Sequence, residues 1–87
     1  MDLEAIILKL QTVELLDFLK SQELNLDDDD FVILKKSKIS GSSFLFFTKE
    51  DFYKNGLASG PTIAMLQLIQ RIKDSTFLNK NFYFNNN

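Results

Sequence analysis

The 87-residue sequence contains no cysteine and no histidine. Without cysteine the chain has no disulfide, no thiolate nucleophile and no sulfur ligand, and without histidine it lacks the commonest general base and metal ligand. Catalysis would have to rely on carboxylates such as Glu50 and Asp51, which are better explained as residues at the start of a helix. We therefore predict a protein that is not an enzyme and that uses no metal, no other cofactor and no small-molecule substrate.

Long apolar runs are also missing. No stretch of the sequence approaches the ~18 apolar residues that a membrane-spanning helix needs. Residues 1–10 lack the basic flank and the long apolar run of a secretory signal. These patterns predict a protein without a membrane span, in the cytoplasm or the nucleus.

Glycine and proline are scarce, with three residues and one residue respectively, whereas 45% of the chain is apolar and nine residues are phenylalanine. A chain of this length should form one compact unit around one core. Because a domain this short buries only ~60–65% of its unfolded surface, we expect its stability to be modest.

The formal charge of −2 hides an uneven distribution. Residues 1–34 contain nine acids and two bases, a net charge of −7, and residues 35–87 contain eight bases and three acids, a net charge of +5. If the two halves face different ways, the molecule is a dipole suited to head-to-tail association. If folding intermixes the charges, the asymmetry has no such consequence.

Apolar residues recur at helical spacing in residues 1–11, which predicts a helical N-terminal arm or extension. Thr12 then has the residue type of an N-cap for a helix over about 13–21. The inward face of that helix would carry an i, i+3, i+4 triplet of Leu15, Phe18 and Leu19.

Four consecutive aspartates, Asp27–Asp30, precede an apolar run and then Lys35, Lys36 and Lys38. A calcium-binding EF-hand loop also concentrates aspartate, but the glycine at loop position six and the glutamate at position twelve are missing here. Acids at the start of a helix and bases at its end are what the helix dipole favours. The pattern therefore predicts a helix over about 28–37 and no metal site.

A capping signal follows in the middle of the chain. Thr48 is followed three residues later by Asp51, a variant of the capping box that predicts a helix over 49–54. This helix favours a helical turn, rather than a buried strand, for the apolar cluster at 44–47. Asn55 and Gly56 then end the helix.

Gly60 and Pro61 mark the start of the last and longest helix, predicted over about 61–74. A helical wheel gathers its apolar residues onto one broad arc, which predicts the core face: Met65, Leu66, Leu68, Ile69 and Ile72. Ile63 lies off this arc, on the polar side. Residues 76–87 are rich in asparagine and aromatic residues, carry no strong helix signal, and are predicted to form a C-terminal tail.

The order of these elements resembles the sterile alpha motif (SAM) domain family. The resemblance spans roughly residues 12–73 and is most specific between 39 and 60. The residues that carry it are Leu15, Phe18, Leu19, Leu34, Ile39, Gly41, Phe44, Leu45, Phe47, Thr48, Glu50, Asp51, Phe52, Gly56, Leu57, Gly60, Met65, Leu66, Ile69 and Ile72. It implies an all-α, five-helix bundle over residues 12–75, with short helices and a longer C-terminal helix. Two features depart from the family pattern: the linker Ala58-Ser59 is shorter than in many members, and Asn55 stands where an apolar residue is common.

The resemblance also implies a function. SAM domains mostly join proteins through an end-helix surface, at the start of the last helix, and a mid-loop surface over the middle of the domain. The implied partner is therefore protein, either another SAM domain or a second copy of this chain. The end-helix positions are Lys54, Asn55, Ser59, Gly60, Thr62, Ile63 and Ala64. The mid-loop positions are Phe46, Glu50 and Tyr53, of which Phe46 either faces water or fills the core.

A minority of the family binds RNA stem-loops through basic residues around the start of the last helix, and this is the alternative function. The present chain has no lysine or arginine between Asn55 and Gln70. Without such residues the counterion release that drives phosphate binding is missing. We therefore favour a protein-binding adaptor or scaffold, with Ile63 as the apolar anchor of a patch with a polar rim. The competing interpretation is that a lone exposed isoleucine is ordinary on a protein surface.

Overall fold

The computed structural model describes the backbone of residues 2–85 and the side chains of residues 2–75. The described residues form six helices and no strand, which confirms the predicted all-α fold. The helices are α1 (Leu3–Leu8), α2 (Thr12–Lys20), α3 (Asp28–Lys36), α4 (Gly41–Phe44), α5 (Lys49–Lys54) and α6 (Ser59–Asn85).

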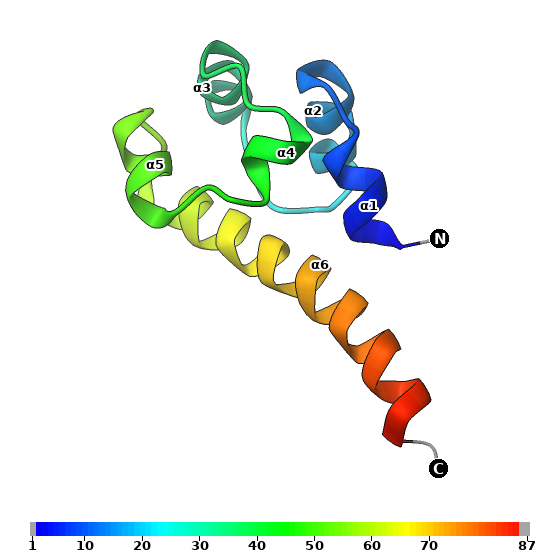
Figure 1. Ribbon diagram of the computed structural model, residues 1–87. Helices are drawn as coiled ribbons and strands as arrows, with labels where there is room; N and C mark the ends of the chain where they lie inside the picture. Colours follow the sequence, from blue (N-terminus) through cyan, green and yellow to red (C-terminus); the bar gives the residue numbers. More distant parts are fainter. Residues whose placement is uncertain (1, 86–87) are drawn as a thin grey trace.

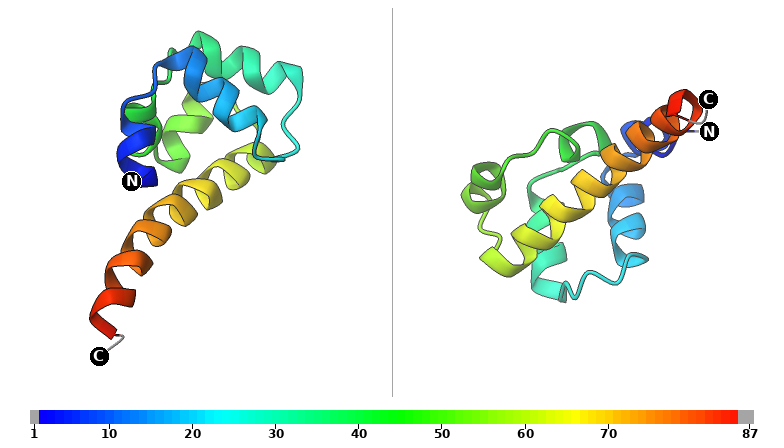
Figure 2. Two further views of the ribbon diagram at one scale, coloured as in Figure 1. Left: turned by 90° about the vertical axis from the view of Figure 1, so that its right-hand side faces the viewer. Right: turned by 90° about the horizontal axis from the view of Figure 1, so that it is seen from below.

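Helix α6 is the axis of the fold. The five shorter helices gather against its N-terminal half, and the rest of α6 projects from this body (Figures 1 and 2). Both α1 and α5 pack against α6, while α2 packs against α3 and α1 against α4. All five short helices therefore share one core with the first half of α6.

Each helix contributes at least one buried apolar side chain to this core. The arc predicted for the last helix is confirmed, since Met65, Leu68, Ile69 and Ile72 are buried and Leu66 is half-buried. The remaining buried apolar residues are Ile7, Leu15, Leu16, Leu19, Leu34, Ile39, Phe44, Leu45, Phe52 and Leu57.

Helix α1, which the sequence predicted as an arm or extension, packs into the body of the domain. Its Ile7 is fully buried. The backbone N–H of Gly41 donates a hydrogen bond of 2.8 Å to the carbonyl oxygen of Leu10, just after α1. A Cβ atom at position 41 would overlap the backbone carbonyl of Ile7, so the close approach of α4 to α1 requires glycine there.

Two helices start one or two residues earlier than the sequence predicted. The N-cap of α2 is Gln11 and not Thr12, and the backbone N–H of Gln11 donates to Glu14 Oε1 at 2.9 Å. Helix α6 begins at Ser59, two residues before Pro61, and its first turn includes a hydrogen bond from the Thr62 N–H to the Ala58 carbonyl at 3.0 Å. Pro61 lies in the first turn, where its missing N–H leaves no hydrogen bond unmade.

Two other segments also differ from the sequence prediction. Only Phe44 of the cluster at 44–47 lies inside a helix, because Ser40 caps α4 and the helix occupies residues 41–44. The last helix, predicted to end near Asp74, continues in the backbone to Asn85, through most of the segment predicted as a tail.

We predict that Gly41→Ala destabilises the domain strongly, because the added methyl group meets backbone that cannot move independently. The expected loss is about 3 kcal/mol, or a fall of roughly 10–20 °C in the melting temperature. The matched control is Gly60→Ala on α6, where an added Cβ has open space. That change should be neutral or raise the melting temperature by a few degrees, about 0.5 kcal/mol. Thermal unfolding followed by circular dichroism measures both, and equal effects would contradict the packing described for α1 and α4.

Candidate functional site

The connection between α5 and α6 holds the first turn of α6 in place. Gly56 has a φ of +94°, a conformation that favours glycine and that ends α5. The Leu57 N–H donates to the Phe52 carbonyl at 3.1 Å, and the side chain of Leu57 is buried. The Asn55 side-chain amide donates to the Asp51 carbonyl at 2.8 Å, which explains a polar residue at this position.

The start of α6 exposes one large apolar side chain. Ile63 is 51% exposed, as predicted from its position off the core arc. The predicted neighbours Lys54, Asn55, Ser59 and Gly60 are also exposed, and Ala64 is half-buried.

Thr62 does not belong to this surface, and its predicted place on the end-helix rim is wrong. The side chain is fully buried, and its Oγ1 has no hydrogen-bond partner among the residues that the structure describes. The cause is the helical register, since Thr62 stands three residues before Met65 and seven before Ile69 and so faces the core with them. Sequence reasoning treated threonine as a surface residue, although this spacing already indicated burial.

The three predicted mid-loop residues all lie at the surface. Phe46 is 71% exposed, which decides between its two predicted positions in favour of water, and Tyr53 is 41% exposed. Glu50 is exposed on the first turn of α5. Phe47 turns inward and packs edge-to-face on the buried Phe52, with ring centroids 5.0 Å apart, so it fixes the turn that presents Phe46 outward.

A lysine ammonium group lies close to each of the two exposed aromatic rings. Lys73 Nζ lies 5.5 Å from the ring centroid of Phe46, and Lys49 Nζ lies 5.8 Å from that of Tyr53. Both distances are within the range of cation–π attraction. Since Lys73 is ten residues, or about 15 Å of helix, beyond Ile63 on α6, the Phe46 side of the domain is distinct from the Ile63 end.

A capping box positions α5, the helix that carries Glu50 and Tyr53. Asp51 Oδ2 accepts from the Thr48 N–H at 2.8 Å and from the Thr48 hydroxyl at 3.0 Å, and the Asp51 N–H donates to Thr48 Oγ1 at 3.2 Å. The hydrogen bonds from the Thr48 backbone and side chain, helped by the charge of Lys54, hold the pKa of Asp51 below its ordinary value of 3.8. The predicted capping box is confirmed.

The aspartates at the start of α3 are also used for capping. Asp27 Oδ1 accepts from the Asp30 N–H, and Asp30 Oδ2 accepts from the Asp27 N–H, each at 3.0 Å. Among the described residues no group of three or more acidic side chains is arranged to hold a metal ion. Over the same part of the chain, none of the helices is both long enough and apolar enough to cross a membrane.

The bundle of short helices packed against one long terminal helix is the fold of a SAM-like domain. A family model described as a SAM-like domain matches residues 4–71, and the chain belongs to this family. No curated protein and no solved structure matches the chain. SAM-like domains are generally used for protein interaction and are typically not catalytic.

We predict that Asp51→Asn lowers the stability of the domain at neutral pH and makes that stability fall less as the pH is lowered. The charged form of Asp51 is favoured in the fold, so its contribution is present above the unfolded pKa and is lost as the pH falls through the lower folded pKa. The melting temperatures of the two proteins should therefore converge as the pH falls from about 6 to about 2.

The control for this experiment is Glu50→Gln, which removes a carboxylate from the same helical turn without changing the hydrogen bonds to Thr48. A difference between Asp51→Asn and the unaltered chain that stays constant over the whole pH range would contradict a stabilising role for the charge.

Proposed function

We propose that this domain is a noncatalytic adaptor or scaffold that joins proteins through the two surfaces described above. The end-helix surface consists of Ile63 with Lys54, Asn55, Ser59, Gly60 and Ala64, and the mid-loop surface consists of Phe46, Glu50 and Tyr53. The end-helix surface of one molecule binds the mid-loop surface of the next. The next molecule is a second copy of the chain or another SAM-like domain.

The exposure of Ile63 carries this proposal. Half of an isoleucine side chain is left in water on a helix whose other large aliphatic residues among 59–75 are buried or half-buried. Burying the rest of the side chain in a partner would contribute about 1 kcal/mol or more. An apolar centre with exposed polar residues around it is the usual anatomy of a small protein interface.

The mid-loop surface supports the proposal from the other side of the contact. Exposed aromatic rings are enriched at the centres of interfaces, and two of them lie here on neighbouring elements. The nearby charges include Lys49 and Lys73, so this surface is not acidic overall. The contact therefore depends on apolar burial more than on the charge difference between the two halves of the chain.

A head-to-tail contact of this kind does not end at two molecules. Each molecule binds one neighbour through its end-helix surface and a second neighbour through its mid-loop surface, so the product is an open chain or a ring. This property is what a scaffold needs, because one domain then holds two neighbours at fixed spacing.

We predict that Ile63→Glu weakens self-association by about 30-fold, or roughly 2 kcal/mol, as expected for the central residue of an interface. Ile63 is half-exposed, so the melting temperature should change little. Sedimentation velocity over a range of concentrations measures the association. The control is Gln67→Glu, which adds the same charge at an exposed position of the same helix. Equal effects of the two substitutions, or unfolding by Ile63→Glu, would refute the end-helix assignment.

A mixing experiment tests the pairing of the two surfaces. Phe46→Ser should remove the receiving surface, so neither this variant nor Ile63→Glu should form the head-to-tail contact alone. Mixed together, each keeps the surface that the other has lost, and one intact contact remains. The mixture should form a 1:1 heterodimer with the affinity of a single contact. A mixture that associates no more tightly than the two separate variants, while the unaltered chain associates more tightly, would show that Phe46 and Ile63 do not meet.

A further inference from the structure

The exposed face of α3 is not explained by the core or by the two surfaces proposed above. Five side chains of this helix are exposed: Asp28, Asp29, Val32, Lys35 and Lys36. At 100° per residue all five fall within an arc of about 120° that is centred on Val32. They therefore form one continuous face, which we call the α3 face.

Capping requires only two of the four aspartates that begin α3. Asp27 and Asp30 exchange hydrogen bonds with each other's backbone, and Asp30 is buried. Asp28 and Asp29 remain outside this arrangement, exposed to solvent. The helix dipole favours their charge, but it does not account for an exposed valine at the centre of the same face.

The charges of the α3 face are self-complementary. The two acids stand four and three residues before Val32, and the two lysines stand three and four residues after it. Within one helix the acids and lysines are six to eight residues, or about 9–12 Å, apart, which is beyond the i, i+4 spacing of an ion pair. Two such helices packed antiparallel about a two-fold axis at Val32 bring the acids of each next to the lysines of the other.

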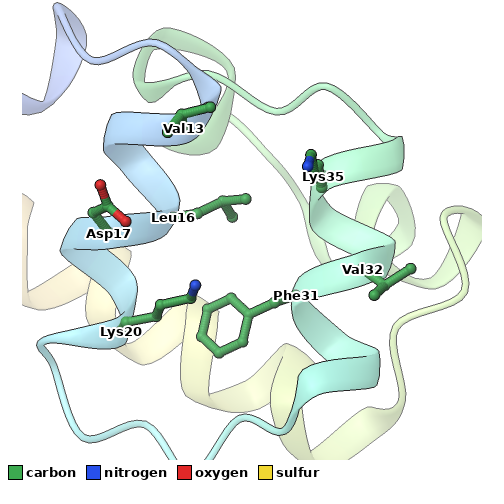
Figure 3. A pocket seen from close by; sticks show the side chains of 7 residues that line it. All are labelled: Val13, Leu16, Asp17, Lys20, Phe31, Val32 and Lys35. Atoms are coloured by element: carbon green, nitrogen blue, oxygen red, sulfur yellow. The ribbon is translucent and has the colours of Figure 1, made fainter.

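An open hollow lies beside this face, between α2 and α3 (Figure 3). Its volume is about 220 Å³, and Leu16 and Phe31 point into it from opposite helices. Val13 and Val32 stand at its edges, 64% and 49% exposed. Lys20 covers one end, with Nζ 5.3 Å from the Phe31 ring centroid. Because small-molecule pockets are usually larger than ~300 Å³, the hollow suits a side chain of another polypeptide.

We propose that the α3 face is a second self-association surface, which pairs two copies of the chain about a two-fold axis through Val32. Asp28 and Asp29 of each copy face Lys36 and Lys35 of the other, and Val32 of each copy covers the edge of the other's hollow. The occupant is a second copy because the arrangement that complements this face is the face itself. Such a contact is isologous and closes at two molecules, unlike the head-to-tail contact of the proposed function.

The expected dimer is weak. Helix α3 has nine residues and is about 13 Å long, so the area buried is well below the ~800 Å² per partner of a standard interface. We expect a dissociation constant on the order of 100 µM at low salt. Since the four ion pairs lie at the rim, raising the salt concentration should dissociate the dimer.

Charge-reversed variants test the pairing directly. One variant carries Asp28→Lys with Asp29→Lys, so that all four charges of its α3 face are positive, and the other carries Lys35→Asp with Lys36→Asp, so that all four are negative. Both are made in the full chain with Ile63→Glu, which removes the proposed end-helix contact. By sedimentation velocity each should be monomeric alone up to ~1 mM, and an equimolar mixture should form a 1:1 dimer at least ~10-fold tighter than either self-pair.

Two controls make the result specific to α3. Lys9→Asp with Arg71→Asp makes the same change in net charge at exposed positions elsewhere, and this protein should not dimerise with the positive variant. In the Ile63→Glu background alone, Val32→Ser should weaken the remaining dimer at least ~10-fold without loss of helix content by circular dichroism.

The outcomes separate this inference from the proposed function. If both variants are folded and their mixture stays monomeric, the α3 dimer is wrong. This is also the result expected if the α3 face binds a different protein. If Ile63→Glu does not reduce the association of the chain, the end-helix contact is wrong. The result of mixing the two charge-reversed α3 variants is unaffected by that outcome.

Discussion

The fold depends on burial against α6, because none of the other helices is long enough to be stable alone. Helices α1 to α5 have between four and nine residues, whereas isolated helices shorter than ~12–15 residues are marginal in water. Each therefore exists only while its apolar side chain is held in the common core, and capping boxes at α3 and α5 reduce the cost of so many helix ends. The register of α6 then decides which residues belong to the core and which face a partner.

That register separates two adjacent residues. Thr62 faces inward with Met65 and Ile69, and Ile63, one residue or 100° further round the helix, faces water. The same division recurs at the turn after α4, where Phe47 packs on Phe52 while Phe46 is exposed. In both places the inward residue anchors the backbone so that the outward residue is presented at a fixed position, which limits the conformational entropy lost on binding.

Much of this arrangement could be predicted from the sequence, since it follows from local periodicity and capping chemistry. The core arc of α6 and the Thr48–Asp51 capping box are examples. The role of Gly41 could not be predicted, because its requirement for glycine comes from the approach of α1, which is distant in the chain. The burial of Thr62 was missed because threonine is usually a surface residue, and this preference was given more weight than its helical spacing. The course of α6 beyond Asp74 was missed because asparagine and aromatic residues give a weak helix signal.

The most direct test of the account is the molar mass of the unaltered 10.1 kDa chain by sedimentation equilibrium, from roughly 10 µM to 1 mM at low salt. An outward Ile63 that docks on the mid-loop surface of the next molecule predicts a mass that keeps rising with concentration past that of a dimer. A mass that stays at the monomer value, or that stops at the dimer, would contradict head-to-tail self-association through the start of α6.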